Sequence, residues 1–227
     1  MSGTVYGIGV GPGDPELITL KAKRLLETLP VLAWPAPLEG EGLARRIAAP
    51  FIPEGRTEIA IRFSFRPERD DTAAAYAKGA RDIAAHLAVG QDVGVLCEGD
   101  PLLFGSFIHL LEHLPDCKVQ VVPGIASPLA AAALTLRPLA TLDEAFVILP
   151  ATRPEAEIER VLSVVEAAAI IKIGRHRDTL ARVLDRLGLI DDAVAVERAG
   201  MPDQAIRPFR DAVCLPYFSL VLVRRST

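Results

Sequence analysis

Three short segments rich in glycine and small side chains contain the residues best suited to bind a ligand. They are residues 7–16, 98–101 and 123–128. Each follows an apolar stretch expected to be a buried strand and precedes a stretch with helical spacing. Glycine permits sharp turns and close approach of the backbone to a ligand, and ligands bind at the carboxyl ends of strands in open α/β sheets. We therefore expect the three turns to line one ligand-binding crevice.

Two common nucleotide-binding patterns do not fit the first segment. Gly7 and Gly9 occupy the first two positions of the dinucleotide-binding fingerprint, but Pro12 stands where its third glycine belongs. No acidic residue follows about 20 positions later to hold a ribose, and the Gly-Lys-Ser/Thr of a P-loop is missing. A nicotinamide-dependent oxidoreductase is therefore disfavoured. A tight strand-to-helix turn that binds no ligand remains the alternative interpretation of this segment.

A possible metal motif lies further along the chain. Residues 109–113 match the H-x-x-E-H pattern of some zinc proteases. We expect a helix over residues 102–114, on which His109 and His113 would share one face as zinc ligands must. A usable site also needs a third ligand and an open pocket, and no supporting motif is present. We predict no metal site and interpret both histidines as polar residues on a helix surface.

Strands and helices alternate along the chain, which is typical of an α/β protein with largely parallel pairing in its first half. Asp14 followed by Pro15 predicts a helix start, because the carboxylate can cap the helix and proline already has a helical φ. The expected strands begin at residue 4 and lie at 31–34, 57–63, 92–97, 118–122, 146–149, 168–173, 194–197 and 217–223, and the expected helices lie at 18–29, 43–48, 73–87, 102–114, 129–134, 155–164 and 179–187. We expect an N-terminal α/β domain of residues 1–116 and a C-terminal α/β domain of residues 117–227.

The composition excludes several classes of protein. Of the 227 residues, 50% are hydrophobic and 24% are charged, as in globular proteins. No apolar run reaches the ~18 residues of a membrane span and no signal-peptide core is present, so we expect a cytoplasmic protein. Three well-separated cysteines without a CxxC pair indicate neither a disulfide framework nor a zinc ribbon. A net charge of −4 argues against non-specific nucleic-acid binding.

Taken together, these segments resemble the tetrapyrrole methylases, which use S-adenosylmethionine. The resemblance rests on residues 9–19, 98–107 and 122–127. Further blocks resemble the branch of the family that methylates carbon 20 of precorrin-2 in cobalamin (vitamin B12) biosynthesis: residues 97–101, 149–152, 172–176, 196–199 and 217–220. The blocks occur in family order and cover nearly the whole chain, so their combination is specific although each is short.

The resemblance implies two α/β domains with the cofactor cleft between them, and a homodimer. Residues 98–100 would approach the methionine end of the cofactor largely through backbone groups, and Ile173 and Ala199 would flank its adenine. Ala126 lacks the hydroxyl that is frequent at its position, and Phe104 replaces a common tyrosine. Carried over position by position, the residues expected to bind S-adenosyl-L-methionine are Pro12, Glu98, Gly99, Asp100, Leu103, Ala126, Ser127, Ile173 and Ala199.

The implied chemistry needs alignment more than acid–base catalysis. The sulfonium methyl is already activated, so the protein must mainly align carbon, methyl and sulfur, which fits a chain without a nucleophile–base triad. No group is assigned as the acceptor of the carbon 20 proton. A tetrapyrrole substrate carries many carboxylates that need cationic partners. The expected partners are Arg62, Arg66, Lys172, Arg175 and His176, with ordinary surface charge as the alternative.

Other functions remain open at this point. The same fold serves methylases of ribosomal RNA or of a modified protein histidine, and the acidic balance without a basic stripe weighs against RNA. A non-catalytic binding module is a further possibility, but it does not explain the three glycine-bearing turns at strand ends. The cobalt-containing counterpart of precorrin-2 is the alternative substrate, because the sequence does not separate the oxygen-dependent pathway from the anaerobic one.

Overall fold

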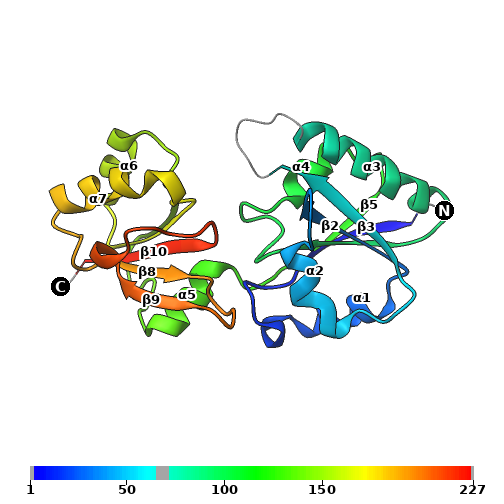
Figure 1. Ribbon diagram of the computed structural model, residues 1–227, viewed down its shortest axis with the longest axis horizontal. Coiled ribbons are helices and arrows are strands. Elements are labelled where there is room, and N and C mark those ends of the chain that lie inside the picture. The colour runs from blue at the N-terminus through cyan, green and yellow to red at the C-terminus, as the bar shows by residue number, and fades with distance from the viewer. Residues whose placement is uncertain (1–2, 65–71, 226–227) are drawn as a thin grey trace. The chain divides into compact units, whose positions relative to one another are not determined.

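The structure is a computed structural model that describes residues 3–64 and 72–225. It contains two compact units, Met1–Ala126 and Ser127–Thr227 (Figure 1). The boundary therefore follows residue 126, whereas the sequence placed it after residue 116. The reason is that strand β5 (Lys118–Val122) pairs along its length with β1 (Thr4–Gly9), so it belongs to the first sheet.

The first unit is built on a parallel sheet of five strands in the order β3-β2-β4-β1-β5. The parallel pairing expected for the first half is confirmed. Its further elements are α1 (Leu20–Thr28), β2 (Val31–Pro37), α2 (Leu43–Ala48), β3 (Thr57–Phe63), α3 (Thr72–Ala88), β4 (Val93–Cys97) and α4 (Phe107–Leu111).

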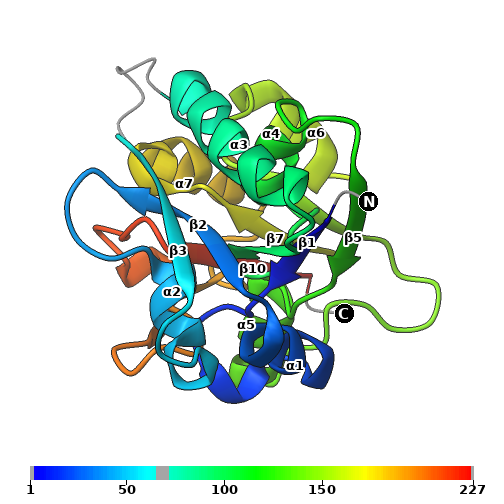
Figure 2. The ribbon, with the colours of Figure 1, turned by 90° about the vertical axis from the view of Figure 1, so that its right-hand side faces the viewer.

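Helices cover both faces of this sheet, with α3 and α4 on one face and α1 and α2 on the other (Figure 2). Val5 of β1 packs with Ile83 of α3 and Phe107 of α4, whereas Ile8 of the same strand packs with Leu26 of α1. Because both faces are buried at the central strands β1, β2 and β4, these strands are nearly continuous apolar runs, and this is why the sequence located them.

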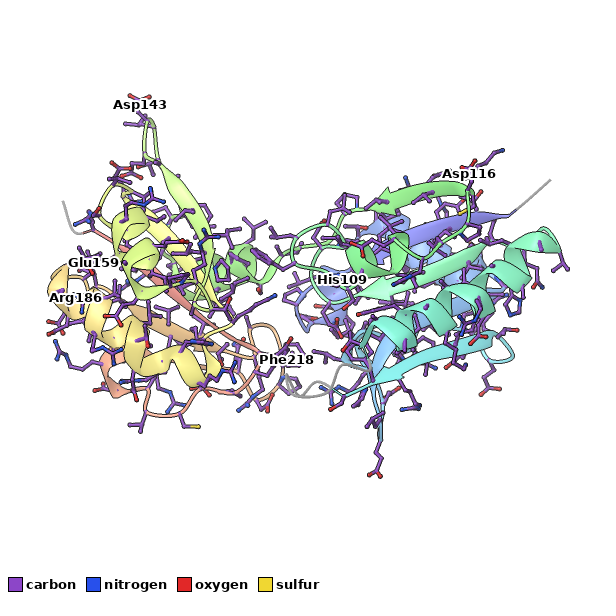
Figure 3. The ribbon with its side chains drawn as sticks, turned by 90° about the horizontal axis from the view of Figure 1, so that it is seen from above. His109, Asp116, Asp143, Glu159, Arg186 and Phe218 are labelled. Carbon is purple, nitrogen blue, oxygen red and sulfur yellow. The ribbon has the colours of Figure 1, made fainter. Side chains whose placement is uncertain are left out.

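The second unit has a mixed sheet in the order β6-β7-β10-β8-β9, in which only β6 and β7 pair in parallel. Helices α6 and α7 pack on one face, and α5 contacts β10. Its elements are α5 (Ser127–Thr135), β6 (Phe146–Pro150), α6 (Glu155–Leu162), β7 (Ala167–Ile171), α7 (Arg177–Arg186), β8 (Val194–Glu197), β9 (Ala205–Pro208) and β10 (Ser219–Arg224). An ion pair between Arg186 and Glu159, at 2.7 Å, joins α7 to α6 on the surface (Figure 3).

Several expected elements differ from those observed. Asp14 caps a single 3-10 turn, Pro15–Leu17, and Thr19 caps α1 by accepting a hydrogen bond from the amide of Ala22. Strand β2 continues to Pro37, whereas the sequence predicted that it ends before Pro35. Its pairing with β4 ends at residue 33, so these prolines interrupt no hydrogen bond on that side.

Among residues 3–64 and 72–225, no helix combines the length and the apolar composition needed to cross a bilayer. The longest described helix is α3, with 17 residues.

Candidate functional site

The three predicted turns follow β1, β4 and β5, and they meet at one edge of the first sheet. Strand β1 lies between β4 and β5, so its turn can touch both of the others. An isolated bridge joins the first two turns: the amide of Gly99 donates to the carbonyl of Gly11 at 2.8 Å, and the amide of Gly11 donates back at 3.4 Å. The convergence expected from the sequence is therefore present.

Glycines let the backbones of these turns pack directly on one another. A Cβ added to Gly9 would lie 2.5 Å from the nitrogen of Gly124, and one added to Gly124 would lie 2.1 Å from the carbonyl oxygen of Gly99. Gly7 leaves space for the ring of Phe107, 2.6 Å from the position its Cβ would take. Gly7, Gly9 and Gly124 were not among the expected cofactor residues. Gly9, inside the apolar end of a strand, was the available signal, because such a glycine marks close backbone approach.

Gly99 lies in the left-handed region, with φ of +64°, and a Cβ added to it would make only ordinary van der Waals contacts. The nearest atom to an added Cβ would be the Cα of Ala126, at 3.8 Å. The turn is therefore less crowded at Gly99 than at Gly9 or Gly124, and a glycine with positive φ is typical of a backbone that lies close to a ligand. Pro12 and Ala126 are buried at the first and third turns, and Leu103 is 37% exposed beyond the second.

The Glu98 carboxylate points to helix α2. Its Oε1 accepts a hydrogen bond from the amide of Ala44 at 3.1 Å, in the first turn of a helix whose N-cap residue, Gly42, has no side chain. Burial raises the pKa of Glu98 above its ordinary value, against the lowering effect of its hydrogen bonds to backbone amides. The side chain thus takes the place of the missing cap, and that the backbone of Glu98 contacts the cofactor remains a prediction.

The thiol that precedes this turn is not suited to nucleophilic chemistry. Cys97 is fully buried in the face that α3 and α4 cover. Desolvation, with a smaller effect from the Glu98 carboxylate, raises the pKa of the Cys97 thiol well above its ordinary range. A thiol with a raised pKa carries little thiolate at neutral pH, so Cys97 is a core residue.

In the second unit, the expected adenine residues lie at the edge where β7 and β8 end and β10 begins. Ile173 and Ala199 are 1% and 6% exposed. Each follows a residue with positive φ, Lys172 at +55° and Arg198 at +48°. The amide of Arg198 donates to the carbonyl of Phe218 at 2.7 Å, which fixes this turn against the segment before β10. Such strained turns at strand ends are typical of functional sites.

The expected cationic partners of a substrate differ in their surroundings. Arg62 is exposed, but its Nη1 donates to the carbonyls of Pro37 and Gly40 at 2.8 and 2.9 Å. Arg66 lies outside the described residues. In the second unit Lys172 and Arg175 are exposed, whereas His176 is half-buried and is the N-cap residue of α7. Arg62 therefore has less capacity for a carboxylate than the sequence implied.

The H-x-x-E-H segment does not have the geometry of a zinc motif. Helix α4 ends at Leu111, so His113 lies beyond it and the expected helix over 102–114 is wrong. The segment before α4 is irregular, with Phe104 at φ of +55°. The imidazole of His109 (labelled in Figure 3) contacts the ring of Tyr76 at a tilt of 36°, with centroids 5.9 Å apart. Within the part of the chain that the structure describes, no three side chains of metal-binding type cluster.

Comparisons with known proteins identify the family. A family model described as Tetrapyrrole (Corrin/Porphyrin) Methylases matches residues 4–210. The chain is 38% identical to precorrin-2 C(20)-methyltransferase of Sinorhizobium sp., covering 97% of this chain and 95% of that protein. It is 30% identical to cobalt-precorrin-2 C(20)-methyltransferase of Salmonella typhimurium, covering 100% and 98%. Cobalamin biosynthesis protein CobIJ of Mycobacterium tuberculosis is 36% identical over 97% of this chain. That relative is longer, and the match covers 46% of its length.

The solved structures show the same fold. Uroporphyrin-III C-methyl transferase from Thermus thermophilus, complexed with S-adenyl homocysteine, matches with a TM-score of 0.70 and 26% identity, over 98% of this chain and 92% of that one. The match spans both units, so the two-sheet α/β architecture is that of the family. The chain therefore belongs to the tetrapyrrole methylases, a family of S-adenosylmethionine-dependent methyltransferases.

Proposed function

We propose that the chain transfers a methyl group from S-adenosylmethionine to carbon 20 of precorrin-2, giving precorrin-3A in cobalamin biosynthesis. The observation that carries this proposal is the 38% identity to a precorrin-2 C(20)-methyltransferase across nearly the full length of both chains. The cobalt-containing counterpart is the second candidate substrate, supported by 30% identity to the corresponding Salmonella enzyme over the same extent.

The chemistry of the described turns supports methyl transfer. The cofactor supplies a methyl group already activated on a sulfonium sulfur. The first unit offers backbone groups fixed by glycine packing, which suits the task of holding reacting atoms in line. No side chain of these turns needs to act as a nucleophile, and the Cys97 thiol at the end of β4 is buried.

The proposed cofactor contacts remain those inferred by position: the residues named at the three turns, and Ser127, Ile173 and Ala199 in the second unit. Lys172, Arg175 and His176 are the proposed carboxylate partners of the substrate. A homodimer is likewise part of the proposal. Titration calorimetry with S-adenosylhomocysteine and with NAD tests the cofactor directly, and tighter binding of NAD would overturn it.

The substrate is tested by incubating the protein with S-adenosylmethionine and either metal-free or cobalt-loaded dihydro-tetrapyrrole. Mass spectrometry should detect the addition of one methyl group, and a 13C-labelled methyl should give an NMR signal on carbon 20. Uroporphyrinogen III and precorrin-4 serve as controls, because relatives named for those substrates are 29% identical to this chain. Faster methylation of either control would overturn the proposed specificity.

A further inference from the structure

The carboxylate of Asp100 is used twice within the protein. Its Oδ1 accepts a hydrogen bond from the amide of Leu102 at 2.9 Å, and its Oδ2 accepts one from the amide of Gly124 at 3.1 Å. Leu102 belongs to the same turn, whereas Gly124 belongs to the turn after β5. Each carboxylate oxygen therefore has a backbone donor before any ligand is considered.

The bond to Gly124 crosses over the end of a strand. Strands β4 and β5 are not neighbours, because β1 lies between them in the sheet. Gly9, the last residue of β1, has no side chain, and the backbone of Gly124 lies where its Cβ would be. Asp100 can therefore reach Gly124 only because β1 ends in a glycine.

The three turns are thus joined in pairs. Gly11 and Gly99 exchange backbone hydrogen bonds between the first and second turns. Gly9 and Gly124 are in backbone contact between the first and third turns. Asp100 joins the second and third turns. Of these three contacts, the one made by Asp100 uses a side chain, whereas the other two are between backbones. A hydrogen bond to a carboxylate is stronger than one between neutral groups. The Asp100 bond is therefore suited to keep the second and third turns together.

A second Asp-Pro pair in the first unit provides a natural comparison. Asp14 precedes Pro15 as Asp100 precedes Pro101, and the Oδ1 of Asp14 accepts from the amide two residues later, that of Glu16, at 2.8 Å. The local turns are the same. The two aspartates differ in that only Asp100, of this pair, also bonds to a residue of another turn.

From this geometry we infer that Asp100 is a positioning residue, whose carboxylate holds the second and third turns together so that the cofactor-binding backbone is assembled before the cofactor arrives. This inference rests on the proposed location of S-adenosylmethionine at these turns. The carboxylate acts through Gly124 and Leu102, and the cofactor is bound by the backbone of the turns.

The test compares Asp100→Ser with Asp14→Ser in the full chain. A serine hydroxyl can keep the local bond to the amide two residues on, so Asp100→Ser mainly removes the bond to Gly124. The affinity for S-adenosylhomocysteine should fall on the order of tenfold in Asp100→Ser and less than twofold in Asp14→Ser. In methyl transfer, KM for S-adenosylmethionine should rise while kcat at saturation is largely kept.

A ligand without the amino group separates positioning from direct contact. If Asp100 acts only through the turns, Asp100→Ser should weaken S-adenosylhomocysteine and its desamino analogue by the same factor. A loss confined to the ligand with the amino group would mean direct contact and would overturn the inference, as would equal affinities of the two serine variants. Failure of the wild-type protein to bind S-adenosylhomocysteine would instead overturn the proposed function, and with it the inference.

Discussion

Replacing Gly124 with alanine should open the three-turn arrangement. The new Cβ would lie 2.1 Å from the carbonyl oxygen of Gly99 and 2.8 Å from the Cα of Gly9. Real Cβ atoms essentially never approach closer than 3.0 Å, so the backbone must move by about the difference, 0.9 Å. Both neighbours are backbone atoms, and neither can rotate away as a long side chain would.

A shift of that size should be costly for a reaction that depends on alignment. Misplacement of about 1 Å can reduce a rate on the order of 100-fold. The same movement lengthens the 3.1 Å bond from the amide of Gly124 to Asp100. We expect Gly124→Ala to weaken S-adenosylhomocysteine binding by about 1.4 to 2.8 kcal/mol, or roughly ten- to 100-fold.

Gly99→Ala is the matched comparison at the same site. Its φ of +64° makes alanine strained by about 1 to 2 kcal/mol, but its Cβ would have only ordinary contacts at 3.8 Å and beyond. Gly188→Ala, at φ of +68° with nothing within 4 Å, carries similar strain in the second unit. It should lower Tm without changing the affinity.

Calorimetry with S-adenosylhomocysteine and thermal unfolding should be measured on the same preparations of all three variants. The expected order of affinity loss is Gly124→Ala, then Gly99→Ala, then Gly188→Ala. A folded Gly124→Ala protein with wild-type affinity would refute the reasoning, because it would show that close packing of the turns does not support the site.

Burial raises the pKa of Glu98, so its ionised form destabilises the folded state increasingly as pH rises from about 4.5 through that pKa. Glu98→Gln should therefore unfold at a higher Tm than wild type at pH 8, and the difference in Tm should vanish near pH 4. A difference in Tm that stays the same across this pH range would contradict the prediction. Native protein treated with iodoacetamide should be alkylated at exposed Cys214 and not at buried Cys97, and mass spectrometry of the peptides showing the reverse would be evidence against the fold of β4. The double variant His109→Ala, His113→Ala should keep its affinity for S-adenosylhomocysteine, whereas one zinc per chain that is lost in the variant would establish a metal site.

The central strands of the first unit, β1, β2 and β4, were predictable because they are buried on both faces. Such strands are short apolar runs bounded by glycine or proline. The edge strands β3 and β5, which have exposed residues, and helix α2 also have the predicted bounds. Strand β9, Ala205–Pro208, was not predicted. It is an edge strand with three exposed residues, one of them a proline, so it has neither an apolar run nor alternation.

The segment after Asp100 shows why tertiary contacts decide helix length. Residues 102–114 have helical spacing, yet the chain turns irregularly until α4 begins at Phe107. Gly105 packs against the carbonyl of Pro101, 2.5 Å from where its Cβ would lie, and Phe104 has a positive φ. Local propensity cannot report these close contacts, because they depend on where the Asp100 turn is fixed.

The same limit applies to the site itself. Alternating strands and helices place each glycine turn at the carboxyl end of a strand, but they do not say which turns are neighbours. That follows from the strand order, with β1 between β4 and β5. Asp14 and Asp100 are equivalent in sequence, each followed by proline, and both form the same local turn. Only the sheet places Gly124 across the end of β1 from Asp100, and this neighbour turns a local cap into a link between two turns.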